Sequence, residues 1–140
     1  MKTCSAILTL ALTGFSFFTQ AQRIWPQQLI ITPENSGFVK TSTHAEVMQF
    51  IHHISDNHQN AHVISMGTSP EGKDIPVVIL ANPKVTTPAE AKASGKPVIY
   101  IQGNIHAGEV EGKEALMMLM RDILAGDKTY WLDNQILLFA

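Results

Sequence analysis

The chain has no excess of positive charge and only one cysteine. Its 140 residues contain 10 Lys and Arg against 12 Asp and Glu, which gives a formal net charge of −2. This balance lacks the basic excess of proteins that bind nucleic acid or anionic lipid. The single cysteine, Cys4, cannot form an internal disulfide framework. Because 45% of the residues are hydrophobic and 16% are charged, we expect a folded domain and not a disordered chain.

Residues 1–21 have the layout of a secretory signal peptide. Lys2 supplies a positive start, residues 4–18 carry no charge, and Thr19-Gln20-Ala21 places small residues before a cleavage site. A membrane-spanning helix needs about 20 apolar residues. This run is shorter, so a retained anchor is the alternative, and the early position of Cys4 argues against a lipoprotein. We expect cleavage after Ala21 and a secreted or periplasmic protein without a membrane segment.

An extended segment and then a helix are predicted next. Residues 22–40 mix polar residues with two prolines and predict an extended opening segment. Thr43, followed three residues later by Glu46, is a capping box that begins a helix. The apolar stripe of this helix recurs at helical spacing: Val47, Phe50, Ile51 and Ile54. We expect the helix to end near Asp56.

Further along, strand patterns alternate with helices. Residues 62–66 and 75–81 predict a hairpin, because Pro70 and Gly72 between them suit a tight turn. A brief helical turn is expected at 89–93. Residues 97–101 form a nearly continuous apolar run, which predicts a strand buried on both faces. A helix is expected from about Glu109, and a further buried strand from residue 136.

These elements predict an α/β fold with a mixed, largely parallel central sheet flanked by helices. Buried parallel strands need helices on both faces of the sheet, and the sequence predicts two substantial helices. The last predicted strand also stops close to its start, at Ala140. We therefore expect residues 22–140 to be the N-terminal part of a larger domain. A small α+β domain that finishes with an edge strand is the alternative.

Candidate metal ligands follow the predicted strand at 97–101. His106 and Glu109 lie three residues apart in a turn between strand and helix, where open α/β sheets bind their ligands. Imidazole nitrogen and carboxylate oxygen suit Zn²⁺, with bonds of about 2.0–2.2 Å. A catalytic zinc usually has three protein ligands, so a third would come from elsewhere. On spacing alone, the alternative is that Glu109 favours the start of a helix and His106 is an ordinary loop residue.

Other histidines and nearby acids are expected outside a metal site. Two histidines lie off the apolar stripe of the first helix, one lies in its exposed first turn, and two straddle its end: His52, His53, His44, His58 and His62. Glu111 and Glu114 are expected to be acids in the first turn of the second helix.

The order of these features resembles the zinc carboxypeptidase family of the carboxypeptidase A type. The resemblance covers most of residues 22–140 and rests on the helix capped at Thr43, the hairpin pattern Gly67-Thr68-Ser69-Pro70-Glu71-Gly72-Lys73, and His106-Ala107-Gly108-Glu109 after an apolar strand. It implies a carboxypeptidase-like fold, Zn²⁺ as cofactor, and His106 and Glu109 as two of three zinc ligands.

The resemblance also implies an activity. A zinc-activated water would hydrolyse the C-terminal peptide bond of a peptide substrate, with a glutamate as general base. The family's third ligand, a histidine, its general base and its substrate-binding arginines lie far downstream of the first motif. None of them can be placed in this sequence, so no catalytic residue is assigned. We expect the 140-residue chain alone to be inactive and to hold zinc weakly.

One position departs from the family pattern. Gly108 stands where many digestive members have arginine, which removes a contact with the substrate. Related zinc amidohydrolases, which remove acyl groups from amino acids, carry small residues in this loop. An N-acyl amino acid deacylase is therefore one alternative, and a non-catalytic binding module with the same fold is another. The capped helix and the hairpin favour the peptidase.

Overall fold

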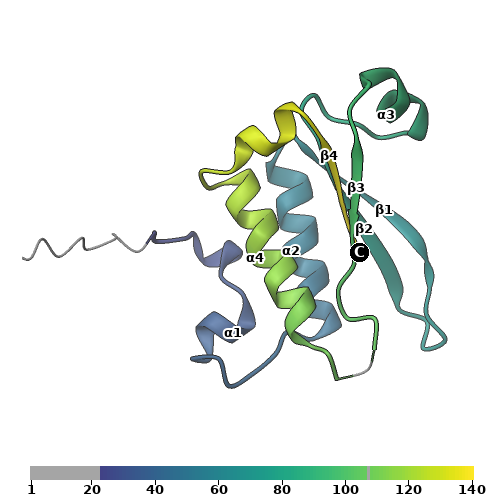
Figure 1. Ribbon diagram of the computed structural model, residues 1–140. Helices are drawn as coiled ribbons and strands as arrows, with labels where there is room; N and C mark the ends of the chain where they lie inside the picture. The colour runs from purple at the N-terminus through teal and green to yellow at the C-terminus, as the bar shows by residue number, and fades with distance from the viewer. Residues whose placement is uncertain (1–22, 107) are drawn as a thin grey trace, which may run out of the picture.

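The computed structural model describes residues 23–106 and 108–140, which form a four-stranded sheet with helices packed against it (Figure 1). The expected signal peptide lies outside the described residues. The strands are β1 (Ala61–Thr68), β2 (Asp74–Leu80), β3 (Val98–Ile101) and β4 (Ile136–Phe139). The α-helices are α1 (Thr32–Asn35), α2 (His44–Asn57), α3 (Pro88–Ser94) and α4 (Glu111–Leu124). Two 3₁₀ turns are η1 (Gln27–Leu29) and η2 (Thr129–Asp133).

The sheet is mixed, with strand order β1-β2-β4-β3. β1 pairs with β2 and β2 pairs with β4 in antiparallel orientation, while β3 and β4 are parallel. The α/β class, the mixed sheet and the hairpin are confirmed. The parallel share of these four strands is smaller than expected, since β2 contributes two antiparallel pairings. The parallel pair is joined by a crossover through α4, as parallel strands require.

Helix α2 forms where its cap predicts it. The Thr43 hydroxyl accepts the Glu46 amide at 3.3 Å, and the Glu46 carboxylate accepts the Thr43 amide at 2.7 Å. These two bonds satisfy amide groups that a helix start otherwise leaves unpaired. The helix ends at Asn57, as expected, and buries Phe50, Ile51 and Ile54.

One face of the sheet carries the main core. Figure 1 shows α2 and α4 side by side against this face, and their buried side chains meet those of the strands. Ile54 of α2, Ile123 of α4 and Leu80 of β2 have no exposed surface. Burying an aliphatic side chain of this size stabilises the fold by about 1.5–3 kcal/mol. The apolar stripes of the two helices therefore pack against the strands to form this core.

The opposite face of the sheet is covered only at one end among the described residues. There, Ala91 of α3 packs near Ile79 and Ile136, beside an apolar hollow of about 580 Å³. Val98 and Tyr100 of β3 remain 51% and 49% exposed. The prediction that residues 97–101 are buried on both faces is therefore wrong for this structure. β3 lies at the sheet edge, and α3 reaches only part of this face.

The opening segment is also different from its prediction. The sequence predicts an extended conformation for residues 22–40, but η1 and α1 form short helical turns in this region. Pro33 stands in the first turn of α1, where its missing amide costs no hydrogen bond. The Glu34 carboxylate accepts the Ile31 amide at 3.1 Å and so caps this turn. Local capping and contacts with α4 thus replace the extended conformation.

Candidate metal site

The candidate site begins where β3 ends. The Gly103 amide donates to the Ala140 carbonyl at 2.9 Å, and the Ala140 amide donates to the Ile101 carbonyl at 3.0 Å. These bonds continue the parallel pairing of β3 and β4 beyond the strands. The loop that carries His106 therefore leaves the sheet from a fixed point, at the carboxyl end of a strand.

Two glycines bring the end of β3 against the start of α4. A Cβ atom on Gly103 would lie 3.0 Å from the carbonyl carbon of Gly112, and one on Gly112 would lie 3.2 Å from the Gly103 Cα. Among the described residues between them, Asn104 and Gly108 have positive φ, 58° and 91°. The close approach confines the intervening residues to a tight loop.

His106 and Glu109 face each other across this loop. The His106 Nδ1 lies 2.9 Å from the Glu109 Oε1, and the His106 amide donates to Oε2 at 3.3 Å. The Glu109 amide in turn donates to the His106 carbonyl at 3.2 Å. The two side chains are 75% and 53% exposed, so a third ligand and a substrate could reach them. The structure brings together the two residues that the sequence paired.

The donor atoms of this pair fit a zinc ion. Two ligands of a tetrahedral zinc with bonds of about 2.1 Å lie about 3.4 Å apart. The observed 2.9 Å between Nδ1 and Oε1 would need to open by about half an ångström, which small side-chain rotations provide. Within residues 23–106 and 108–140, no group of three or more His, Cys, Asp or Glu side chains is placed to hold a metal. The pair therefore offers two ligands of an incomplete set.

The remaining histidines are dispersed over α2 and β1. His44 is exposed in the first turn of α2, as expected, and its Nε2 lies 2.9 Å from the Asp74 carbonyl oxygen. His58 follows the last residue of α2, while His62 belongs to β1, so the two do not share a helical turn. Burial, followed by the nearby His53, lowers the pKa of His58.

A buried carboxylate near the site was not singled out by sequence reasoning. Glu114 does lie in the first turn of α4, as expected, but it is only 8% exposed. Burial raises its pKa, and hydrogen bonds from Thr41, Ser42 and Lys113 outweigh that effect, so the pKa is lowered and the group is ionised. One sequence signal points to this burial. Glu114 lies three residues before Met117, so it is a charged residue on the apolar stripe of α4.

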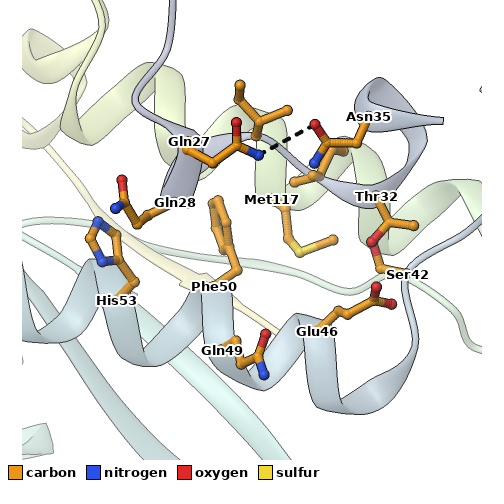
Figure 2. A pocket seen from close by; sticks show the side chains of 12 residues that line it. Gln27, Gln28, Thr32, Asn35, Ser42, Glu46, Gln49, Phe50, His53 and Met117 are labelled. Atoms are coloured by element: carbon orange, nitrogen blue, oxygen red, sulfur yellow. Dashed lines mark hydrogen bonds between the residues drawn. The ribbon is translucent and has the colours of Figure 1, made fainter. Parts of the chain in front are cut away.

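A separate polar hollow lies between the opening segment and α2. Figure 2 shows Gln27 and Asn35 on one side of it and Glu46, Gln49 and His53 of α2 on the other. Its volume is about 370 Å³, and the Gln27 side-chain Nε2 donates to the Asn35 Oδ1 at 3.4 Å. Neither His106 nor Glu109 lines this hollow. Sequence reasoning did not predict it, because its walls are far apart in the chain.

The fold and the site define a mixed α/β protein with a His and a Glu at the carboxyl end of a sheet strand. Residues 47–135, more than half of the chain, match the family model for zinc carboxypeptidase. The chain belongs to this family. No curated protein matched the chain. Among the described residues, no helix is both long enough and apolar enough to cross a membrane.

Solved carboxypeptidase structures have a similar fold. Carboxypeptidase A from Helicoverpa armigera matches with a TM-score of 0.61 and 18% identity, over 71% of this chain and 24% of that chain. Thrombin activatable fibrinolysis inhibitor matches with a TM-score of 0.57 and 15% identity, over 81% of this chain and 27% of that chain. A metallo-carboxypeptidase from Burkholderia cenocepacia matches with a TM-score of 0.53 and 18% identity, over 69% of this chain and 24% of that chain. The chain thus spans about a quarter of the length of these structures.

Proposed function

We propose that this chain is the N-terminal part of an exported zinc metallocarboxypeptidase in which His106 and Glu109 hold the metal. One observation carries the proposal: in a chain of the zinc carboxypeptidase family, the His106 Nδ1 and the Glu109 Oε1 converge to 2.9 Å on an exposed loop. The substrate class is a peptide with a free C-terminus. The third zinc ligand and the general base belong to a later part of the domain.

The residues of this loop have distinct parts in the proposed site. Zinc, when bound, activates a water and polarises the scissile carbonyl group. His106 offers Nδ1, the ring nitrogen that faces Glu109, and Glu109 offers Oε1. The bond from the His106 amide to Oε2 holds the second carboxylate oxygen and so orients the carboxylate. The backbone bond from Glu109 to His106 closes the turn that keeps both side chains on one side.

We further propose that residues 1–21 are a cleaved signal peptide and that residues 22–140 form part of a larger catalytic domain. The signal rests on the sequence pattern alone. The larger domain is supported by the coverage of the solved structures, 24% and 27% for two of them. The half-exposed Val98 and Tyr100 give a second reason, because an apolar sheet face gains stability when further elements cover it.

Zinc titration of the full chain tests the metal assignment. We expect weak binding, because two ligands leave the coordination sphere open. His106→Ala and Glu109→Gln should each abolish it, whereas His44→Ala, which removes an exposed histidine outside the loop, should not. Isothermal titration calorimetry and elemental analysis measure this. Zinc binding that survives both loop substitutions would exclude the proposed site.

An N-acyl amino acid deacylase is the second candidate, and one observation favours it. Gly108 has a φ of 91°, a conformation that side chains rarely adopt, so this loop favours glycine over arginine here. The site thus lacks a basic side chain between His106 and Glu109. Assays of a protein that includes the later part of the domain separate the two activities. Release of C-terminal amino acids from peptides supports the peptidase, and release of acyl groups from N-acyl amino acids alone supports the deacylase.

A further inference from the structure

Glu114 joins two segments that are far apart in the chain. Its Oε1 accepts the Thr41 hydroxyl and the Ser42 amide, both at 2.6 Å, and its Oε2 accepts the Ser42 hydroxyl at 2.8 Å. Ser42 is itself buried, at 5% exposure. The carboxylate therefore ties the start of α4 to the residues that immediately precede the α2 cap. Buried groups with this many partners hold their neighbours in one arrangement.

Lys113 connects the same cluster to the loop that carries the proposed ligands. Its Nζ donates to the Val110 carbonyl at 3.1 Å and to the Thr41 hydroxyl at 2.5 Å, and it lies 3.1 Å from the Glu114 Oε1. These three partners match the three N–H groups of an ammonium. The Val110 carbonyl belongs to the peptide unit between Val110 and Glu111, one residue beyond Glu109. Lys113 therefore fixes the backbone next to a proposed zinc ligand.

We propose that Lys113 and Glu114 are positioning residues for the His106–Glu109 pair. The proposal rests on the proposed function. Among the hydrogen bonds and ion pairs of the described residues, none joins Lys113 or Glu114 to the ligand side chains, so they act through the backbone. Glu114 holds Thr41, Thr41 and Glu114 hold the Lys113 ammonium, and Lys113 holds Val110. With Val110 held and Gly103 seated against Gly112, both ends of the loop are anchored. Glu109 is then presented to His106 before a metal arrives, which lowers the cost of ordering the site on binding.

The test compares Lys113→Met and Glu114→Gln, in the first turn of α4, with two controls at or beyond the C-terminal end of that helix. Lys128→Met removes a lysine that lies just beyond the end of α4 and forms an ion pair with Asp122. Ile123→Val trims a fully buried side chain of α4 and lowers the melting temperature without touching the loop. Two measurements are made on the full chain: zinc affinity, and hydrogen exchange at the Glu109 amide in the absence of metal.

Lys113→Met and Glu114→Gln should weaken zinc binding by about tenfold, as for residues that orient metal ligands. Both should also speed exchange at the Glu109 amide without metal. The controls should leave both quantities within about twofold of the unsubstituted chain, as for distant sites. If Lys113→Met and Glu114→Gln behave like Ile123→Val in both measurements, the positioning role is excluded. If the unsubstituted chain binds no zinc, the proposed metal site fails, and exchange at Glu109 still decides whether the loop is positioned.

Discussion

The buried Arg121 and the partly exposed Glu34 form an ion pair that holds the opening segment on α4. Arg121 is 3% exposed and makes two bonds with the Glu34 carboxylate, at 2.7 and 2.9 Å. Its guanidinium also donates to the Leu29 carbonyl at 2.8 Å and lies 4.5 Å from the Trp25 ring centre. Planar, two-pronged pairing of this kind is what arginine provides and lysine does not. One residue of α4 thus places residues 25–34.

This ion pair makes the free energy of unfolding depend on pH. Burial raises the pKa of Glu34, but the bonds from Arg121 and the Ile31 amide outweigh it and hold the pKa below its ordinary 4.5. A lowered carboxyl pKa stabilises the fold above that ordinary value, and the stabilisation is lost as the pH falls through the folded-state pKa. Glu34→Gln should therefore cost about 3 kcal/mol near neutral pH, by leaving Arg121 buried without its partner.

The cost of Glu34→Gln should shrink as the pH is lowered below 4.5. Urea unfolding of the two proteins across this range measures the difference in the free energy of unfolding. Glu71→Gln, in an exposed pair with Lys73, is the matched control and should change stability little. A constant difference between Glu34→Gln and the unsubstituted chain at all pH values would contradict the assignment.

At the scale of elements, the contact between β3 and α4 depends on Gly103 and Gly112. Alanine at either position would place a Cβ 3.0–3.2 Å from backbone atoms, which cannot move aside as a side-chain end does. Overpacking of this kind costs about 1–3 kcal/mol. Gly112 lies within α4, where the higher helix propensity of alanine would stabilise the helix by about 1 kcal/mol and offset part of this cost.

Gly103→Ala should therefore destabilise the protein more than Gly112→Ala does. Both substitutions should also displace the loop that carries His106 and Glu109, since its two ends move apart. Thermal unfolding measures the order of stability, and NMR chemical shifts of residues 104–109 report the displacement. The reverse order, or unchanged shifts in both variants, would show that the close approach of the glycines is not what shapes the loop.

At the scale of the whole molecule, the two faces of the sheet differ. Ile54 of α2, which packs in the core between the helices and the sheet, has no exposed surface. Ile64 of β1, on the other face of the sheet, is 40% exposed. Removal of a fully buried side chain loses its transfer free energy and leaves a cavity. Ile54→Ala should therefore cost about 2–5 kcal/mol.

Ile64→Ala is the matched control, and it should cost clearly less in this chain because solvent already reaches the side chain. Chemical denaturation of both variants measures the difference. Equal losses would mean that the second face is covered in solution. In a longer protein whose later part packs on this face, the cost of Ile64→Ala should rise toward that of Ile54→Ala.

Local pattern predicted most of the elements and the pairing of His106 with Glu109. Thr43 and Glu46 lie within one helical turn, so their capping box was visible in the sequence, and the structure forms it. The helical turns of the opening segment were not predicted, because they depend partly on Arg121, which lies 87 residues after Glu34. The role of Glu114 was missed for the same reason, since Thr41 lies 73 residues away from it.

The sequence by itself determined where α2, α4 and the strands form, because caps, turns and apolar periodicity act between neighbouring residues. It also determined the family, which is carried by the order of local motifs. The tertiary structure decided the strand order, which puts β3 at an edge and leaves Val98 half exposed. It also decided which charges are buried and how both ends of the loop that carries His106 and Glu109 are held. These features depend on contacts between distant segments, which no local pattern specifies.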